Sequence, residues 1–174
     1  MARTLDLARE GVVGTPGAGF TAQEYGNKHH HTTLLTVNTT LPAIAGGASL
    51  AVGKLAYTFP AGAIRVMSTR MSIAITQTEE NITADTPDIG IGTVIASGAV
   101  AVLGGTATFE NILTGQTAAD CDGTVTTKTV DTSLVIEASG AHTVYFNVAD
   151  GWAADGDAGA LVAGDILINW QYLG

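Results

Sequence analysis

Short runs of alternating apolar and polar residues follow one another along the chain from residue 33 onward. In the run 63–76, Met71, Ile73 and Ile75 alternate with small polar or neutral residues. Because successive side chains of a β-strand point to opposite faces, this pattern predicts a strand with one buried face. The closing run 165–173 alternates in the same way and predicts a C-terminal strand held inside a sheet.

Similar runs recur at the spacing expected of an all-β protein. No segment shows a sustained helical period, and the polar stretch 77–88 is expected to be an exposed loop. We therefore predict one all-β domain over residues 33–174, a single antiparallel β-sandwich of jelly-roll type. Its expected strands are 33–41, 49–59, 63–76, 89–105 (with a turn at Ser97-Gly98), 106–114, 124–130, 132–138, 142–150 and 165–173. Ser139-Gly140-Ala141 is expected to join the strands 132–138 and 142–150 as a hairpin.

Residues 1–32 show neither period and contain the breaker cluster "GTPGAG". Two interpretations stay open: a frayed terminus, or an extended N-terminal arm that becomes ordered on a neighbouring subunit. In the second interpretation the arm carries the contacts to the partner. The candidate partner-binding residues are Val12, Val13, Phe20, Tyr25, His29 and His31.

Three of the four histidines stand together in "KHHHTT", at the end of this arm. On an extended chain His29 and His31 share one face and His30 points to the other. Two imidazoles are too few for a closed zinc site, which uses about four ligands. We therefore interpret the triplet as a polar boundary between arm and body and expect no metal and no cofactor. A metal there would require several subunits to meet.

The composition favours a β-rich protein with many tight turns and a surface of small neutral side chains. The 174 residues include 22 glycines, and only 13% are charged. Such a surface is poor at keeping a protein monomeric, so we expect a homo-oligomer. The net charge is −9, and no Lys or Arg follows Lys128. Direct binding to nucleic acid is not expected, because phosphate recognition needs clustered basic residues.

Cys121 is the single cysteine, so no intrachain disulfide can form, which fits a reducing compartment. The first residues lack the pattern of a secretory signal, and no apolar run approaches the roughly 18 residues of a membrane span. We expect a protein that is made in a cytoplasm, stays soluble until it assembles, and does not enter a membrane.

No catalytic motif is recognisable, and we expect no enzyme activity. Gly90 and Gly92 lack the third glycine of a dinucleotide-binding loop, so bulges or close packing are expected there. No G-x-S-x-G motif is present, and the acidic neighbours of Cys121 disfavour its thiolate. The acidic stretches 120–123 and 150–165 miss the spacing of an EF-hand and are expected to be polar turns. Whether the segment Asp150–Asp165 binds a metal stays open.

The arm, the strand entry "FPAGAIRV" and the small-residue stretch "GIGTVIASGAVAVLGGTATFENILTGQT" resemble structural proteins of tailed bacteriophage particles. Over residues 59–117 the chain is similar in style to the small β-sandwich decoration (cement) proteins of phage heads. The resemblance implies a non-enzymatic virion protein, most simply a homotrimer on the capsid surface. Its partner would be the major capsid protein, and it would bridge neighbouring coat subunits through the arm.

The alternative is a β-sandwich carbohydrate- or receptor-binding module of a virion fibre or tip. Carbohydrate sites favour exposed aromatic side chains, and Trp152 in "DGWAADG" is the candidate for a glycan contact. A shell-forming coat subunit is disfavoured, because the coat folds of large phages are longer and mixed α/β.

Overall fold

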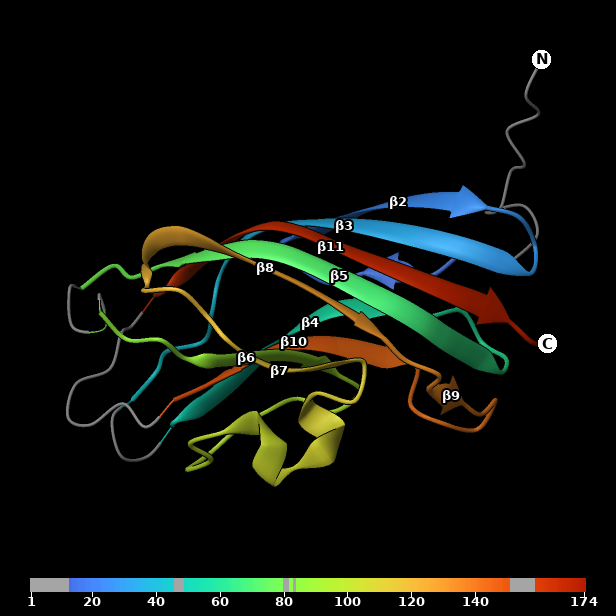
Figure 1. Ribbon diagram of the computed structural model, residues 1–174. Helices are drawn as coiled ribbons and strands as arrows, with labels where there is room; N and C mark the ends of the chain where they lie inside the picture. Colours follow the sequence, from blue (N-terminus) through green and yellow to red (C-terminus); the bar gives the residue numbers. More distant parts are fainter. Residues whose placement is uncertain (1–12, 46–48, 80–81, 83, 151–158) are drawn as a thin grey trace, which may run out of the picture.

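A computed structural model of the chain describes residues 13–45, 49–79, 82, 84–150 and 159–174. Two antiparallel sheets pack face to face (Figure 1). The first sheet has the order β1-β4-β10-β6-β7, the second has the order β2-β3-β11-β5-β8, and β9 pairs with β5. The strands are β1 (Thr15–Pro16), β2 (Phe20–Gly26), β3 (His30–Thr40), β4 (Ala51–Thr58), β5 (Ile64–Thr76), β6 (Asp88–Gly92), β7 (Leu113–Thr117), β8 (Asp122–Asp131), β9 (Val135–Ile136), β10 (Thr143–Ala149) and β11 (Leu161–Tyr172).

Eight of these strands form a jelly roll. A jelly roll is a double sheet of eight strands built from two Greek keys. Here the two sets of four are β3-β11-β5-β8 and β4-β10-β6-β7, and the chain crosses repeatedly between them. β1 and β2 extend the β4 edge of the first set and the β3 edge of the second. The prediction of an all-β antiparallel sandwich of jelly-roll type is confirmed.

The core lies between the sheets and follows the predicted alternation. Met71, Ile73 and Ile75 of β5 are all buried, as are Ile166 and Ile168 of β11. Three aromatic side chains lie in this core, and Phe59 contacts both Tyr57 and Trp170 edge to face. The sheets therefore adhere mainly by burial of these apolar faces, which is the dominant favourable term in folding.

Residues 93–112 form an insert between β6 and β7 that covers the outer face of the first sheet (Figure 1). It contains the 3₁₀ turns η2 (Leu103–Gly105) and η3 (Ala107–Phe109). The insert packs so closely on β6 that a Cβ at Gly90 or Gly92 would collide with it. The prediction of close-packed glycines is therefore confirmed.

The described residues contain no helix that is long and apolar enough to cross a membrane.

The buried Asn147 of β10 pins the two ends of the insert. Its Oδ1 accepts the Ala96 N–H at 2.9 Å, and its Nδ2 donates to the carbonyls of Val94 at 2.9 Å and Phe109 at 2.7 Å. These contacts explain why the strands and the Ser97-Gly98 turn predicted over residues 93–112 are wrong, whereas the start of the predicted strand 89–105 is present as β6. The side-chain amide takes backbone groups that a strand would have paired with a neighbour.

The structure also corrects the predicted boundary at residue 32. β2 and β3 form a hairpin in the second sheet, so residues 13–32 belong to the sandwich of their own chain. β2 alternates Phe20, Ala22 and Glu24 toward the core, a pattern that is too short to be evident beside the glycine-rich turn that precedes it. Residues 1–12 lie outside the described part of the chain.

Replacement Asn147→Ala is expected to lower the free energy of unfolding by about 3 kcal/mol, because three buried backbone groups lose their partner. Chemical denaturation measures this change. Asn38→Ala, at an exposed position of β3, is the matched control and should change stability by less than about 0.5 kcal/mol. Equal effects of the two substitutions would contradict the pinning role of Asn147.

Candidate functional site

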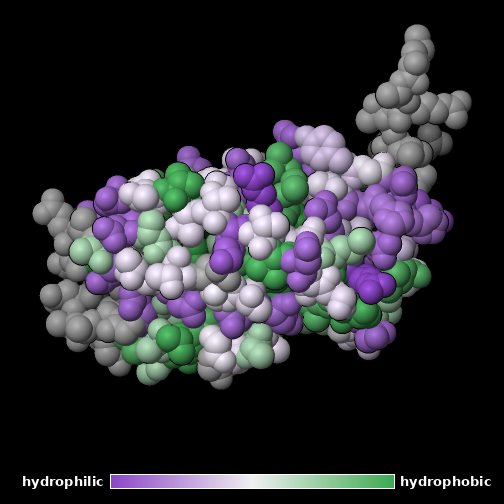
Figure 2. Space-filling model, viewed as in Figure 1, coloured by the Kyte–Doolittle hydropathy of each residue, from purple (hydrophilic) through white to green (hydrophobic). Residues whose placement is uncertain are grey.

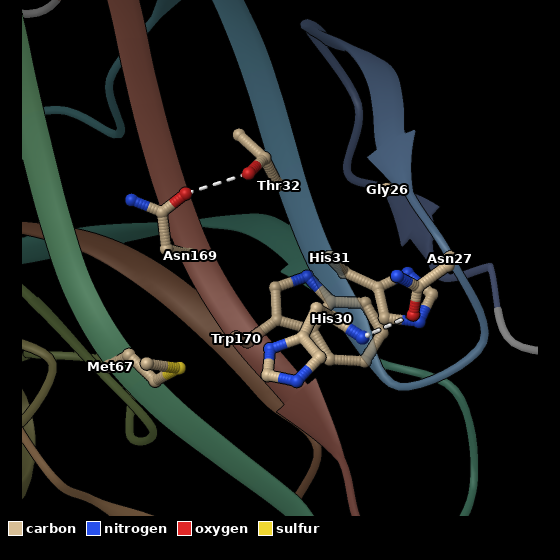
Figure 3. A pocket seen from close by; sticks show the side chains of 8 residues that line it. All are labelled: Gly26, Asn27, His30, His31, Thr32, Met67, Asn169 and Trp170. Atoms are coloured by element: carbon tan, nitrogen blue, oxygen red, sulfur yellow. Dashed lines mark hydrogen bonds between the residues drawn. The ribbon is translucent and has the colours of Figure 1, made fainter. Parts of the chain in front are cut away.

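A hollow of about 300 Å³ lies where the turn between β2 and β3 meets β11 and β5 (Figure 3). Asn27 builds this turn: its Oδ1 accepts the N–H groups of His29 at 2.9 Å and His30 at 3.1 Å. Its own N–H donates to the His30 carbonyl at 2.8 Å. Asparagine suits this position because its side chain imitates a backbone turn. The lining residues are Gly26, Asn27, His30, His31, Thr32, Met67, Asn169 and Trp170.

The three adjacent histidines occupy three different environments. His29 is exposed in the turn. His30 is also exposed, and its ring lies 3.3 Å from the Gln171 amide. His31 is only 3% exposed and stacks on Trp170, with ring centroids 3.9 Å apart and planes 10° apart. Within the described residues no group of three or more His, Cys, Asp or Glu side chains could hold a metal ion. His31 is thus packed into the protein whereas His29 is exposed, so the two side chains do not share one environment.

The polar groups of the hollow are engaged with one another. Thr32 Oγ1 donates to Asn169 Oδ1 at 2.7 Å (Figure 3). Asn169 Nδ2 donates to Ser68 Oγ at 2.9 Å. Asn27 is committed to its turn. The hollow consequently offers a ligand few directed hydrogen-bonding groups.

Behind His31, a chain of hydrogen bonds joins the two sheets. Trp170 Nε1 donates to Thr33 Oγ1 at 2.8 Å, and Thr33 Oγ1 donates to Glu24 Oε2 at 2.8 Å. The Tyr57 hydroxyl, from the other sheet, donates to Glu24 Oε1. The Gly14 N–H donates to the Tyr57 hydroxyl at 2.9 Å. We call this arrangement the Glu24 tie; it links β2, β3 and β11 to β4.

The Glu24 tie contains no cation among these hydrogen-bond partners. Burial raises the pKa of Glu24, and the hydrogen bonds from Tyr57 and Thr33 oppose that rise. Burial and the neighbouring Glu24 charge raise the pKa of Tyr57, so its hydroxyl remains a donor. Both oxygens of the carboxyl group and both hydroxyls are used to join elements of the fold. The tie is thus suited to positioning the N-terminal strands.

Two further carboxyl groups, those of Asp88 and Glu110, hold the insert. Asp88 Oδ2 accepts the Leu103 N–H at 2.8 Å, and Glu110 Oε2 accepts the Gly115 N–H. Both carboxyl groups face Gly115, where a Cβ would collide with them. Burial raises the pKa of each, and the charge of Asp88 raises that of Glu110 further. These carboxylates are fixed by backbone contacts that join the insert to its neighbouring strands.

Among the described strands, β8 is an edge of the second sheet. It pairs with β5 on one side, and none of its ten residues is buried. The Thr132 N–H donates to the Met67 carbonyl at 2.8 Å, so these two opposite residues form a hydrogen-bonded pair. From this pair onward, hydrogen-bonded and non-hydrogen-bonded pairs alternate along β8 and β5. By this alternation the N–H and C=O groups of Val125, Thr127 and Thr129 point away from β5. Figure 2 shows apolar residues scattered among polar ones on this side of the molecule.

The residues predicted to bind a partner differ in how far they are exposed to solvent. Phe20 is 6% exposed and packs in the core of its own chain, so it cannot anchor an arm on a neighbour while docked there. Val13 is half-buried, whereas Tyr25 is 52% exposed. Val12 and the glycan candidate Trp152 lie outside the described residues.

The prediction that the acidic stretches are turns is wrong in part, because Asp122 begins β8 and residues 161–165 belong to β11. Asp122 Oδ1 accepts the Thr124 N–H at 2.9 Å, and these hydrogen bonds to Thr124 lower the pKa of Asp122. Asp165 accepts a hydrogen bond from Thr36 Oγ1 at 2.7 Å across the outer face of the second sheet. Residues 151–158 of the other stretch are outside the described part of the chain.

Sequence reasoning missed the Glu24 tie. The available signal was the alternation in "FTAQEYG", which places Glu24 on the same face as Phe20 and Ala22. A carboxylate at an inward position of a strand needs partners. The partners are Thr33 of β3 and Tyr57 of β4, and Trp170 of β11 donates in turn to Thr33. Only the folded topology brings β4 and β11 to this carboxylate.

A comparison with protein-family models finds no match, and a comparison with curated protein sequences finds none. Among solved structures, a crystal structure of an arabinose-bound α-L-arabinofuranosidase aligns with 90% of this chain and 23% of that chain. The identity is 12% and the TM-score is 0.40. The chain thus spans less than a quarter of that protein, and a TM-score of this size supports no inference about activity.

Glu24→Gln is expected to remove a pH-dependent loss of stability. A carboxyl group whose pKa is raised on folding stabilises the fold fully below its unfolded pKa, and that contribution is lost as pH rises through the folded pKa. The free energy of unfolding of Glu24→Gln minus that of the wild type should therefore grow from pH 4 toward pH 8. The exposed Glu137→Gln is the control. A difference that is constant with pH would contradict this assignment.

Proposed function

We propose that this chain is a non-enzymatic virion structural protein, a decoration or cement protein that binds the outside of a tailed-phage head. The observation that carries the proposal is the edge of β8, a strand of ten residues without a buried side chain. Such an edge presents unpaired backbone groups to which another chain can add a strand. A partner bound in this way is held mainly by main-chain hydrogen bonds.

The side chains of β8 support this use. Val125 is 60% exposed, the strand is rich in threonine, and its single basic residue is Lys128. Threonine and valine fit a pleated, half-buried surface well. A coat segment added here would cover Val125 and place its own side chains beside Thr127 and Thr129. Lys128 would favour a neutral or acidic segment.

The chemistry of the described residues also supports a structural role. The buried or half-buried carboxyl groups of Glu24, Asp88 and Glu110 are each engaged in hydrogen bonds that join elements of the fold. The low charge and small neutral surface suit burial against other subunits. The partner under this proposal is the major capsid protein, and the decoration protein acts as a homo-oligomer, most simply a trimer.

The alternative, a carbohydrate- or receptor-binding module, depends on Trp152. That residue is outside the described part of the chain, so no contact on which the alternative depends has been located.

Thr129→Pro is expected to weaken binding to the phage head about tenfold or more. Proline removes an N–H that points away from β5, so it blocks an added strand while leaving the ladder within the protein. Thr129→Ala keeps that N–H and should bind within about twofold of the wild type. Cosedimentation with heads that lack the protein measures both. Equal binding by the wild type and Thr129→Pro would contradict docking through β8.

Deletion of residues 1–12 tests the arm separately. If the arm bridges coat subunits, the deleted protein binds heads more weakly, even though the β8 edge is intact. If binding is unchanged while Thr129→Pro fails to bind, the edge strand carries the interaction alone. If the deleted protein and Thr129→Pro both bind heads as well as the wild type does, the proposed mode of attachment is wrong.

A further inference from the structure

The segment of residues 13–26, which contains β1 and β2, lies outside the eight-strand roll. Among the described strands, β1 pairs only with β4, and β2 pairs only with β3. The segment crosses from the edge of one sheet to the edge of the other. Removing it leaves both sets of four strands with their order unchanged. The segment is thus a docked addition to a roll that is already closed.

The segment docks in a slot that is formed by β3, β4 and β11, and its contacts there are specific. The Gly17 N–H donates to the Ala56 carbonyl at 3.0 Å, and Gly14 lies so close to Tyr57 that a Cβ would collide with its ring. Phe20 enters the core, and Glu24 makes the tie described above. The receiving groups belong to β3, β4 and β11. Every copy of the protein therefore carries an identical slot.

The connection between the segment and the roll is short and exposed. Gly26 has φ +120°, a conformation that residues other than glycine rarely adopt. The Asn27 side chain bonds the turn at His29 and His30, and His31 Nε2 lies 3.3 Å from the Lys28 carbonyl. The side chains of Asn27, Lys28, His29 and His30 are exposed. Opening this turn removes its local hydrogen bonds without exposing the core. β2 could then run straight on from β3.

From these observations we propose that residues 13–26 are an exchangeable strand segment, which docks in the slot of a second copy of this chain when the turn at residues 26–30 opens. The exchanged form keeps the Glu24 tie, the Phe20 contact and the β2–β3 register, now between chains. Only the turn differs between the two forms, so concentration and the length of the turn decide which one is populated. This inference concerns self-assembly and goes beyond docking to a head.

Cross-linking between two kinds of chain tests the exchange. Thr21 and Thr36 are opposite each other in the β2–β3 register, and both are exposed. One chain carries Thr21→Cys and the other, with a tag that changes its size, carries Thr36→Cys, both in a Cys121→Ala background. The chains are refolded together at increasing concentrations and treated with a short bis-maleimide. Exchange produces a covalent dimer of the two chains, and its yield rises with concentration.

A matched pair controls for random contact. Thr21→Cys is mixed with Thr129→Cys, which is equally exposed but lies on the opposite edge of the second sheet. This pair should give at least about tenfold less product than the Thr21–Thr36 pair, because no exchanged form brings the two positions together. Equal yields from the two pairs at every concentration would overturn the proposal.

The length of the turn provides a second readout that needs no cysteine. Deletion of residues 27–29 leaves only His30 between the paired Gly26 and His31, which is fewer than the two residues of a tight hairpin loop, so light scattering should show mostly oligomer. Insertion of two glycines after Lys28 relaxes the turn and should give mostly monomer. A protein without residues 27–29 that folds as a monomer with this segment docked, or two variants of equal native mass, would contradict the exchange.

Discussion

The burial of Glu24 between the sheets is the constraint on which the N-terminal half of the structure depends. A carboxyl group can be removed from water only if its oxygens find donors. Thr33 and Tyr57 supply those donors, and the hydroxyl oxygens of these two residues in turn accept from Trp170 and Gly14. The tie therefore fixes β2 against both sheets at once. It also explains why this segment docks at this position on the roll.

The same principle, a polar side chain that holds an irregular segment, operates on the opposite side of the molecule. Asn147 satisfies backbone groups of the insert, and Asp88 and Glu110 attach it to the strands on either side. The outer face of the first sheet is thereby covered by its own insert. The edge of β8 has no such cover among the described residues. This contrast leads us to place the contact with a partner at β8.

The class of fold could be predicted because its signal is local. Alternation over a few residues identified the buried faces of β5 and β11 without knowledge of their neighbours. Long-range pairing could not be read in this way. The predicted hairpin around Ser139-Gly140-Ala141 is wrong, since β9 pairs with β5 in one sheet and β10 pairs with β4 and β6 in the other. The Glu24 tie was missed for the same reason, because its members are remote in sequence.

Hydrogen exchange on the protein bound to phage heads tests the central claim most directly. If a coat segment adds to the sheet, the outward-pointing amides of Val125, Thr127 and Thr129 become protected on binding. The insert of residues 93–112, which takes no part in that contact, keeps its exchange rates. Protection confined to the insert, with the β8 amides exchanging as fast as in the free protein, would contradict the account.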